Sequence, residues 1–205
     1  MGSVLVILST NRGRAIRQRS RGFSRASICH AGRVQLVTPR LVLREYARGD
    51  FDAVHRFASD PENSRFVAWG PNTPDDTRMF IEGWLEEQAT EPRTGWTFAV
   101  TEPSGEPFGS VGLYRQGPYD AETGFAISRD RWGTGYATEA AQALLRFGFD
   151  TLGLHRIWAT CRPENVGSYR VLEKIGMQRE GRLRDHVLIR GAWQDSLLYA
   201  AIAPG

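Results

Sequence analysis

Two glycines between a strand-like run and a helix-like run are the strongest chemical signal in the chain. Glycine tolerates positive φ and lets main chain approach a ligand closely, and the first N–H groups of a helix have no partner within it. Because the helix dipole also favours an anion at this end, the segment predicts a phosphate cradle. A helix that merely begins after a glycine turn is the alternative. The segment consists of Trp132, Gly133, Thr134, Gly135, Tyr136, Ala137 and Thr138.

The flanking patterns place this cradle at a strand-to-helix turn. Phe125 and Ile127 alternate along the run before it, and small or apolar residues recur at helical spacing after it. A dinucleotide-binding fingerprint would need a third glycine where Thr138 stands, and no βαβ unit opens the domain. We therefore disfavour dinucleotide binding.

A second segment adds to the signal. The apolar run 155–161 is followed by Asn165-x-x-Ser168 at the opening of a predicted helix over 166–175. The two polar side chains lie about one helical turn apart, so both can face one crevice. The alternative is a purely structural role, in which Asn165 caps the helix and Ser168 hydrogen-bonds to the main chain.

Together the two segments resemble the GNAT superfamily of acetyl-CoA-dependent N-acetyltransferases, in particular the RimJ/RimL branch of ribosomal-protein N-terminal acetyltransferases. The resemblance covers about residues 36–203. In that family Gln/Arg-x-x-Gly-x-Gly/Ala binds the coenzyme A pyrophosphate. Gly135 and Ala137 match this motif, whereas Trp132 replaces its Gln or Arg. The resemblance implies acetyl-CoA as co-substrate, held by residues 132–138 together with Asn165 and Ser168.

The resemblance also implies an α/β GNAT fold, with a mixed central sheet of about six to seven strands flanked by about four helices. The strands near 122–128 and 155–161 would be parallel neighbours that splay apart. Splaying leaves main-chain groups unpaired, so we expect those of Phe125, Ala126 and Ile127 to bind the pantetheine arm. The other expected strands are 36–46, 96–101, 108–114, 182–189 and 196–202, and the expected helices begin near 50, 75, 137 and 166.

The implied chemistry is acyl transfer from a thioester to an unprotonated amine. At pH 7 about 15% of an α-amino group is free base, against roughly 0.04% of a lysine-type amine. Strand amides near Ile127 would stabilise the oxyanion of the tetrahedral intermediate. From the family, Ser168 is expected to protonate the departing thiolate. Many other GNAT enzymes place a tyrosine where Leu172 stands, and Tyr169 would point elsewhere on the helix.

For a general base, Glu122 is the leading candidate, because relatives often carry a carboxylate at the start of this strand. A solvated strand-edge residue is the alternative. Asp185 and His186, on the late strand, are weaker candidates.

The acceptor pocket should be formed by segments 49–88 and 182–193, with Trp69, Trp84 and Trp193 as candidate walls. The expected acceptor is the α-amino group of a protein or peptide. The alternatives are a small amine, such as a polyamine or an aminoglycoside, and a non-catalytic acyl-CoA-binding sensor module.

Length and charge divide the chain into two parts. Its 205 residues, 41% of them hydrophobic, suit one globular domain over residues 36–205. Residues 1–35 hold seven arginines and no acid, so removing them turns the net charge of +3 into −4 for the rest. We expect a disordered or loosely attached extension. Organelle targeting and a nucleic-acid-binding arm are the alternatives, the latter ranked last.

Other functions find little support in the sequence. Cys29 and Cys161 are too few for a disulfide framework, and the four histidines are scattered, so no metal site is expected. No apolar run approaches the ~20 residues of a membrane-spanning helix. We expect a cytoplasmic protein without membrane contact, in which an exposed apolar edge would allow a homodimer.

Overall fold

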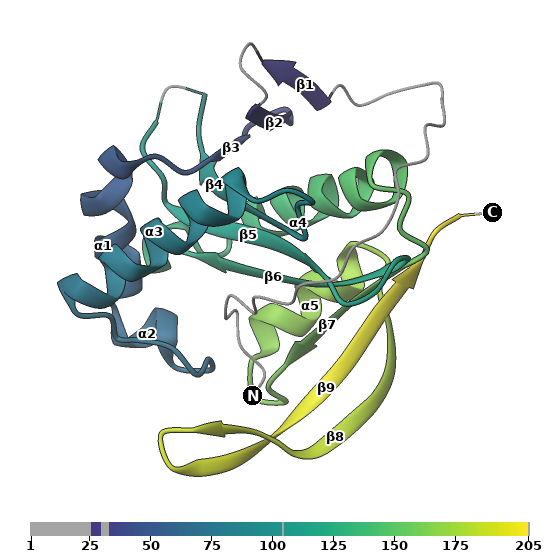
Figure 1. The fold of residues 1–205 in the computed structure, drawn as a ribbon. Coiled ribbons are helices and arrows are strands. Elements are labelled where there is room, and N and C mark those ends of the chain that lie inside the picture. The colour runs from purple at the N-terminus through teal and green to yellow at the C-terminus, as the bar shows by residue number, and fades with distance from the viewer. Residues whose placement is uncertain (1–25, 30–32, 104, 205) are drawn as a thin grey trace.

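The computed structural model describes residues 26–29, 33–103 and 105–204. Its described residues form one nine-stranded sheet in the order β1-β2-β3-β4-β5-β6-β7-β9-β8 (Figure 1). Only β6 and β7 pair in parallel among these strands, which confirms a mixed α/β sheet with one parallel pair. The strands are β1 Ala26–Cys29, β2 Arg33–Val37, β3 Val42–Glu45, β4 Gly95–Thr101, β5 Gly109–Arg115, β6 Asp120–Ile127, β7 Arg156–Cys161, β8 Gln178–Ile189 and β9 Ala192–Ile202.

The sheet has more strands than the six to seven that the sequence predicts. The expected strand 36–46 is divided between β2 and β3 by a tight turn, in which the Thr38 N–H donates to the Leu41 carbonyl at 2.9 Å. Pro39 lies in this turn. Because proline has no N–H, it cannot donate a hydrogen bond to a neighbouring strand. The remaining strand is β1, within the range 1–35 assigned to an extension. Residues 1–25 and 30–32 lie outside the described residues, so the character of the extension there stays a prediction.

Five α-helices are described, one more than the sequence predicts. The additional one is the single-turn α2, where Pro61 occupies the first turn and the Asp60 carboxylate accepts from the Glu62 N–H at 2.9 Å. A helix this short has no apolar periodicity by which the sequence could reveal it. The helices are α1 Phe51–Ala58, α2 Pro61–Ser64, α3 Pro74–Ala89, α4 Tyr136–Arg146 and α5 Val166–Lys174.

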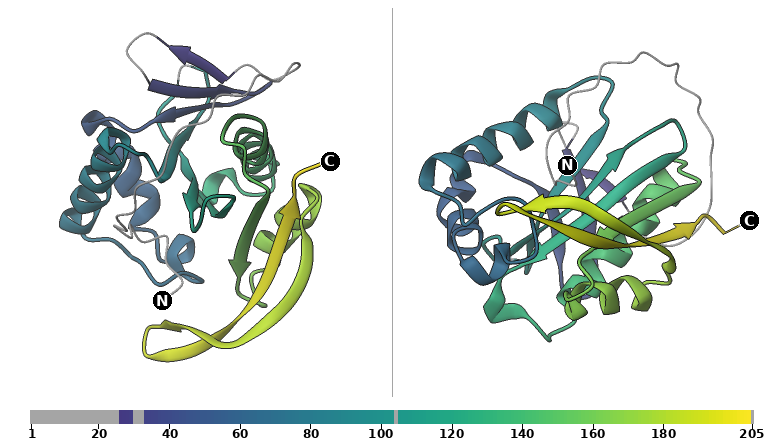
Figure 2. Two further views of the ribbon diagram at one scale, coloured as in Figure 1. Left: turned by 45° about the vertical axis from the view of Figure 1, so that its right-hand side comes forward. Right: turned by 90° about the horizontal axis from the view of Figure 1, so that it is seen from below.

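The helices cover both faces of the sheet (Figure 2). On one face α4 and α5 pack against the large apolar cluster, which includes Phe98, Val100 and Leu144. On the other face α1 and α3 pack around a smaller cluster that includes Trp84 and Ala99. Because adjacent β4 residues enter opposite clusters, this strand is buried on both faces and forms the centre of the fold.

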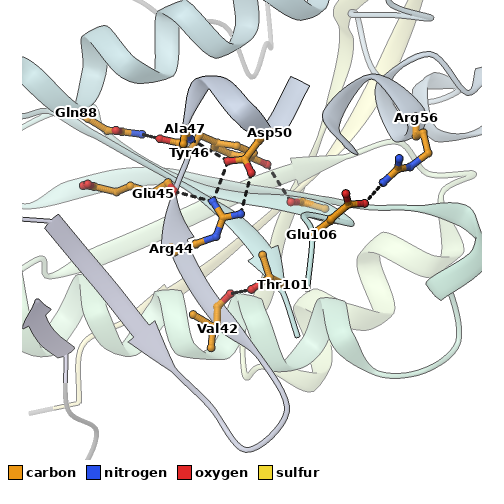
Figure 3. A network of polar contacts seen from close by, with 11 residues as sticks. Val42, Arg44, Glu45, Tyr46, Ala47, Asp50, Arg56, Gln88, Thr101 and Glu106 are labelled. Atoms are coloured by element: carbon orange, nitrogen blue, oxygen red, sulfur yellow. Dashed lines mark hydrogen bonds and ion pairs between the residues drawn. The ribbon is translucent and has the colours of Figure 1, made fainter. Parts of the chain in front are cut away.

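A polar network fixes the start of α1 against the sheet (Figure 3). Arg44 donates two hydrogen bonds of 2.8 Å to the Asp50 carboxylate, which also accepts from the Ala47 N–H at 2.8 Å. Burial opposes ionisation of this carboxyl, but these hydrogen bonds outweigh it and lower the pKa of Asp50. The buried Tyr46 hydroxyl donates to the Gly109 carbonyl at 2.9 Å, tying β3 to β5. The α1–α3 layer is thereby anchored to the central strands.

The β8–β9 hairpin extends well beyond the rest of the sheet (Figure 2). Its turn residue Arg190 has a φ of 47° and reaches the loop after α2. The guanidinium donates to the carbonyls of Ser64 at 3.1 Å and Gly70 at 2.8 Å. The hairpin tip and the α2 loop, distant in sequence, are thus joined by hydrogen bonds.

Candidate active site

The parallel ladder between β6 and β7 is short. It pairs Asp120–Glu122 with Arg156–Trp158 and then ends. Beyond that point β6 stays paired with β5 as far as Ile127, and β7 stays paired with β9 as far as Cys161. The two strands therefore separate while each remains fixed on its outer side, as the family resemblance implies for the strands near 122–128 and 155–161.

The strand geometry decides which main-chain groups face this gap. The Ser128 N–H donates to the Phe108 carbonyl on β5 at 2.8 Å. Because bonding direction alternates along an antiparallel pair, Ala126 also directs its main-chain groups at β5, whereas Phe125 and Ile127 direct theirs at the gap. Of the three residues predicted to offer main-chain groups, two are suitably oriented.

Trp132 has a structural task at the end of β6. Its indole Nε1 donates to the Ile127 carbonyl at 2.7 Å, while 52% of the residue's surface stays exposed. The Ile127 carbonyl thus already accepts a hydrogen bond, whereas the Ile127 N–H remains available to a ligand. Trp132 therefore replaces the Gln or Arg of the motif with a side chain whose hydrogen bond holds the turn against the end of β6.

The glycine turn has the geometry that the sequence predicts. Gly133 and Gly135 have φ values of 76° and 85°, a region that disfavours side chains. Gly135 caps α4, and the first helical hydrogen bond runs from the Glu139 N–H to the Gly135 carbonyl at 3.0 Å. The N–H groups of residues 136–138 consequently have no acceptor within the helix. The arrangement provides a cluster of donors at the positive end of a helix.

A clamp from the β2–β3 turn holds this cradle. The Glu139 carboxylate accepts from Thr38 Oγ1 at 2.7 Å, from the Arg40 N–H at 2.9 Å and from Arg40 Nε at 2.6 Å. The same guanidinium donates to the Thr134 carbonyl at 2.9 Å and lies 4.6 Å from the centre of the Tyr136 ring. We call Thr38, Arg40 and Glu139 the turn clamp. Sequence reasoning missed it, because its partners are about 100 positions apart.

The electrostatics of the turn clamp follow from these bonds. Burial opposes ionisation of the Glu139 carboxyl, but the hydrogen bonds from Thr38 and Arg40 outweigh it and hold the pKa of Glu139 below its ordinary value. The carboxylate is therefore charged at neutral pH. It also neutralises the positive charge of Arg40 beside the glycine turn.

The start of α5 brings Ser168 to the end of β7. The Asn165 side chain accepts from the Ser168 N–H at 3.1 Å, so Asn165 is the cap of this helix. Burial raises the pKa of the neighbouring Cys161 thiol to about 11, although the Arg162 charge and the Ser168 side chain lower it. Ser168 thus lies beside the splayed strand, while Leu172 is fully buried and Tyr169 packs against the core.

Glu122 marks the point where the strands separate. It lies opposite Tyr114 on β5 and Trp158 on β7. Burial raises the pKa of its carboxyl to about 7, and among the described residues no ion pair offsets that burial. A carboxyl titrating near neutrality can accept a proton under working conditions.

Asp185 and His186 occupy an irregular part of the β8–β9 hairpin. Asp185 has a φ of 46° within a register shift, and its N–H donates to the Asp195 carboxylate at 3.0 Å. His186 Nδ1 lies 2.6 Å from Ser196 Oγ. Burial, followed by the Arg162 charge, lowers the pKa of His186. Both residues thus have structural partners on β9.

The three tryptophans expected to form pocket walls differ in position. Trp84 is 6% exposed and stacks on Tyr46 with ring centres 4.1 Å apart, so it belongs to the core and not to a pocket wall. Trp69 lies edge-on to Phe80 at 5.8 Å, next to the α2 loop. Trp193 is 60% exposed near the hairpin tip. The segments around Trp69 and Trp193 are the ones that Arg190 connects.

Two further properties concern the part of the chain that the structure describes. No group of three or more His, Cys, Asp or Glu side chains is arranged there to hold a metal ion. Nor does any helix in the same ranges combine the length and the apolar character that a bilayer crossing requires.

Comparison with known proteins places this geometry in a family. The family model described as "Acetyltransferase (GNAT) domain" matches residues 40–178. An uncharacterized N-acetyltransferase of Bacillus subtilis (strain 168), YnaD, is 34% identical over 171 residues, covering 82% of this chain and 97% of the relative.

The names of two further relatives state an activity or a bound ligand. The [ribosomal protein uS5]-alanine N-acetyltransferase of Escherichia coli (strain K12) is 29% identical over 182 residues, covering 84% of this chain and 92% of that protein. The solved structure of Mycobacterium smegmatis RimJ in complex with CoA-disulfide has a TM-score of 0.68 and 28% identity, covering 80% of this chain and 82% of that one.

The turn clamp generates a prediction on stability. Replacing Glu139 by Gln keeps its size but removes the charge, so the free energy of unfolding at pH 7 should fall by about 1 kcal/mol. Because the pKa of Glu139 is depressed, this contribution is present above the ordinary carboxyl pKa and is lost as the pH falls through its lower folded-state value. Urea denaturation at pH 7 and at about pH 3 measures the difference between variant and wild type.

The matched control is Glu86→Gln, which removes an exposed carboxyl from α3. It should change stability little at either pH. A Glu139→Gln effect of the same size at both pH values would contradict the ionic clamp.

Proposed function

The chain belongs to the GNAT acetyltransferase family and is an acetyl-CoA-dependent N-acetyltransferase, and on this premise we propose that it acetylates the α-amino group of a protein or peptide. The separation of β6 and β7 beside a glycine-capped helix carries the proposal. The proposed acceptor class is supported by a 29% identical relative, the [ribosomal protein uS5]-alanine N-acetyltransferase of Escherichia coli (strain K12).

The residues present fit coenzyme A in two ways. The main-chain donors of residues 133–138 suit a pyrophosphate, because they cluster at the positive end of α4. The main-chain groups of Phe125 and Ile127 directed at the gap suit the amides of a pantetheine arm, which can complete the interrupted ladder as an added strand would. When bound, acetyl-CoA supplies an activated acetyl thioester.

This chain's own groups have three tasks in the reaction. The Phe125 N–H, which faces the gap three residues beyond Glu122, would donate to the negative charge that develops on the acyl oxygen. Glu122 would take a proton from the amine, directly or through a water. Ser168, beside the end of β7, would give a proton to the leaving sulfur. Each of these groups is held by a strand or by the start of a helix.

The properties of Glu122 favour an α-amine as acceptor. A base with a pKa near 7 can deprotonate an ammonium group with pKa ~7.8 with little penalty, whereas a lysine-type ammonium of pKa ~10.4 is more than two orders of magnitude less acidic. An α-amine is also partly free base at neutral pH. The modest basicity of Glu122 thus matches the less basic acceptor.

An acceptor screen tests the proposal. We expect coenzyme A release with peptides that have a free N-terminus, and mass spectrometry should place the acetyl group on the α-nitrogen. The same peptides with a blocked N-terminus and an internal lysine are the control and should react far more slowly. Faster turnover of polyamines or aminoglycosides would contradict the proposed acceptor class, and coenzyme A binding without release from any amine would contradict catalysis.

Glu122 generates a prediction on pH dependence. Below about pH 7 both the carboxyl and the α-ammonium become protonated, so log kcat/KM for a peptide should fall with a slope approaching 2. Glu122→Gln should reduce the plateau by about 100-fold and leave only the slope of 1 that belongs to the amine. A variant profile with the wild-type slope would show that Glu122 is a buried edge residue without a catalytic role.

Ser168 generates a prediction on kcat. Ser168→Ala should lower kcat by about 100-fold, because the thiolate loses its proton donor, while coenzyme A affinity measured by calorimetry changes little. Tyr169→Phe, which removes the adjacent hydroxyl on the same helix, is the control and should retain activity. An alanine variant with kcat within about twofold of wild type would refute the acid role.

A further inference from the structure

Arg162 is a buried cation, and two of its three guanidinium nitrogens lack a hydrogen-bond partner among the described residues. The residue is 4% exposed and directly follows β7. Its Nε and Nη1 atoms are buried, and no hydrogen-bond partner lies within reach among the described residues. A buried, unpaired guanidinium is unfavourable, and a native protein seldom keeps one without a reason.

Nearby carboxylates do not account for this charge. Asp195 is committed to Arg182 Nε at 2.6 Å and to the Asp185 N–H at 3.0 Å. Glu164 is exposed at the surface. In the described part of the chain, no carboxylate oxygen lies within 4.0 Å of the Arg162 guanidinium. An ion pair internal to the fold therefore does not explain the arginine.

Arg162 lies on the face of the sheet opposite α4 and α5. Ile157, Ala159 and Cys161 enter the core cluster shared with those helices. Because strand residues alternate between faces, Trp158, Thr160 and Arg162 belong to the opposite face. Ser196 on β9 continues this face, since Cys161 pairs with Leu197, and His186 contacts Ser196 there. His186 and Ser196 of the hairpin thus lie on the same face as Arg162.

Glu122 lies on the same face as Arg162. It is in register with Trp158, four residues before Arg162, which corresponds to about 13 Å along an extended strand. One end of the face therefore has a group able to take a proton from an ammonium, and the other end has an unpaired cation. This pair of groups suits a ligand with an amine at one end and an anion a short distance along it.

We propose that Arg162 is an anion subsite that selects amine acceptors bearing a carboxylate within their first few residues. The inference rests on the proposed function and narrows its acceptor to peptides whose second or third residue is acidic. A carboxylate there would supply the acceptor oxygens that the guanidinium lacks. Polycationic amines would meet an uncompensated positive charge at the same place and would be disfavoured.

Matched peptide pairs test this subsite. Peptides with Asp at position 2 or 3 are compared with the same peptides carrying Asn, which has the same shape without the charge. For wild type we expect kcat/KM to favour the Asp peptide by about tenfold or more at one of the two positions. In Arg162→Gln that ratio should fall to about one, and in Arg162→Lys, which keeps the charge, it should stay above one.

The control and the contrary outcomes separate this inference from the proposed function. Arg170→Gln removes an exposed arginine from α5 and should leave the Asp-to-Asn ratio unchanged. Equal rates for Asp and Asn peptides in the wild type would overturn the subsite while leaving N-terminal acetylation intact, and no acetylation of any peptide would overturn the function itself. A raised KM for acetyl-CoA in Arg162→Gln, with an unaltered ratio, would show that the arginine serves the coenzyme instead. Circular dichroism checks that each variant is folded.

Discussion

The early end of the β6–β7 ladder is the constraint on which the site depends. Hydrogen-bonding groups of a central sheet are normally paired, and leaving them free inside a protein is costly. Here the outer neighbours β5 and β9 hold each strand along its whole length, so the strands cannot close the gap beyond Glu122 and Trp158. A ligand with peptide-like amides can satisfy the exposed edges, which links binding to the architecture of the sheet.

The same separation lies next to the groups that we propose to bind the coenzyme. The glycine turn that begins α4 follows the end of β6, the strand that borders the gap. The turn is held from both sides, by the Trp132 indole on the Ile127 carbonyl and by Arg40 and Thr38 on Glu139. Such a brace keeps the donors in place before a ligand arrives, and preorganised donors bind an anion with a smaller entropic cost.

Two groups on the proposed acceptor side, Glu122 and Arg162, are both buried without an ion-pair partner among the described residues. Burial raises the pKa of Glu122, and Arg162 keeps two buried nitrogens without acceptors among the described residues. The buried carboxylates of Asp50 and Glu45, by contrast, are paired with Arg44 and Arg93. Unpaired charges concentrated along one face of the opening are expected where a ligand, and not the fold, completes the interactions.

Local sequence determined the glycine turn, the starts of α4 and α5, the Asn165 cap and the succession of strands along the chain from β4 onward. It could do so because backbone freedom, capping and hydrophobic periodicity act over a few residues. Tertiary structure alone decided that Thr38 and Arg40 hold Glu139, that Trp84 belongs to the core, that Ala126 turns its main chain to β5, and that Arg190 joins the hairpin to the α2 loop. It also decided that two buried nitrogens of Arg162 have no hydrogen-bond partner among the described residues. These outcomes depend on contacts between residues far apart in the chain, or on which neighbour a strand meets, and neither has a local pattern in the sequence.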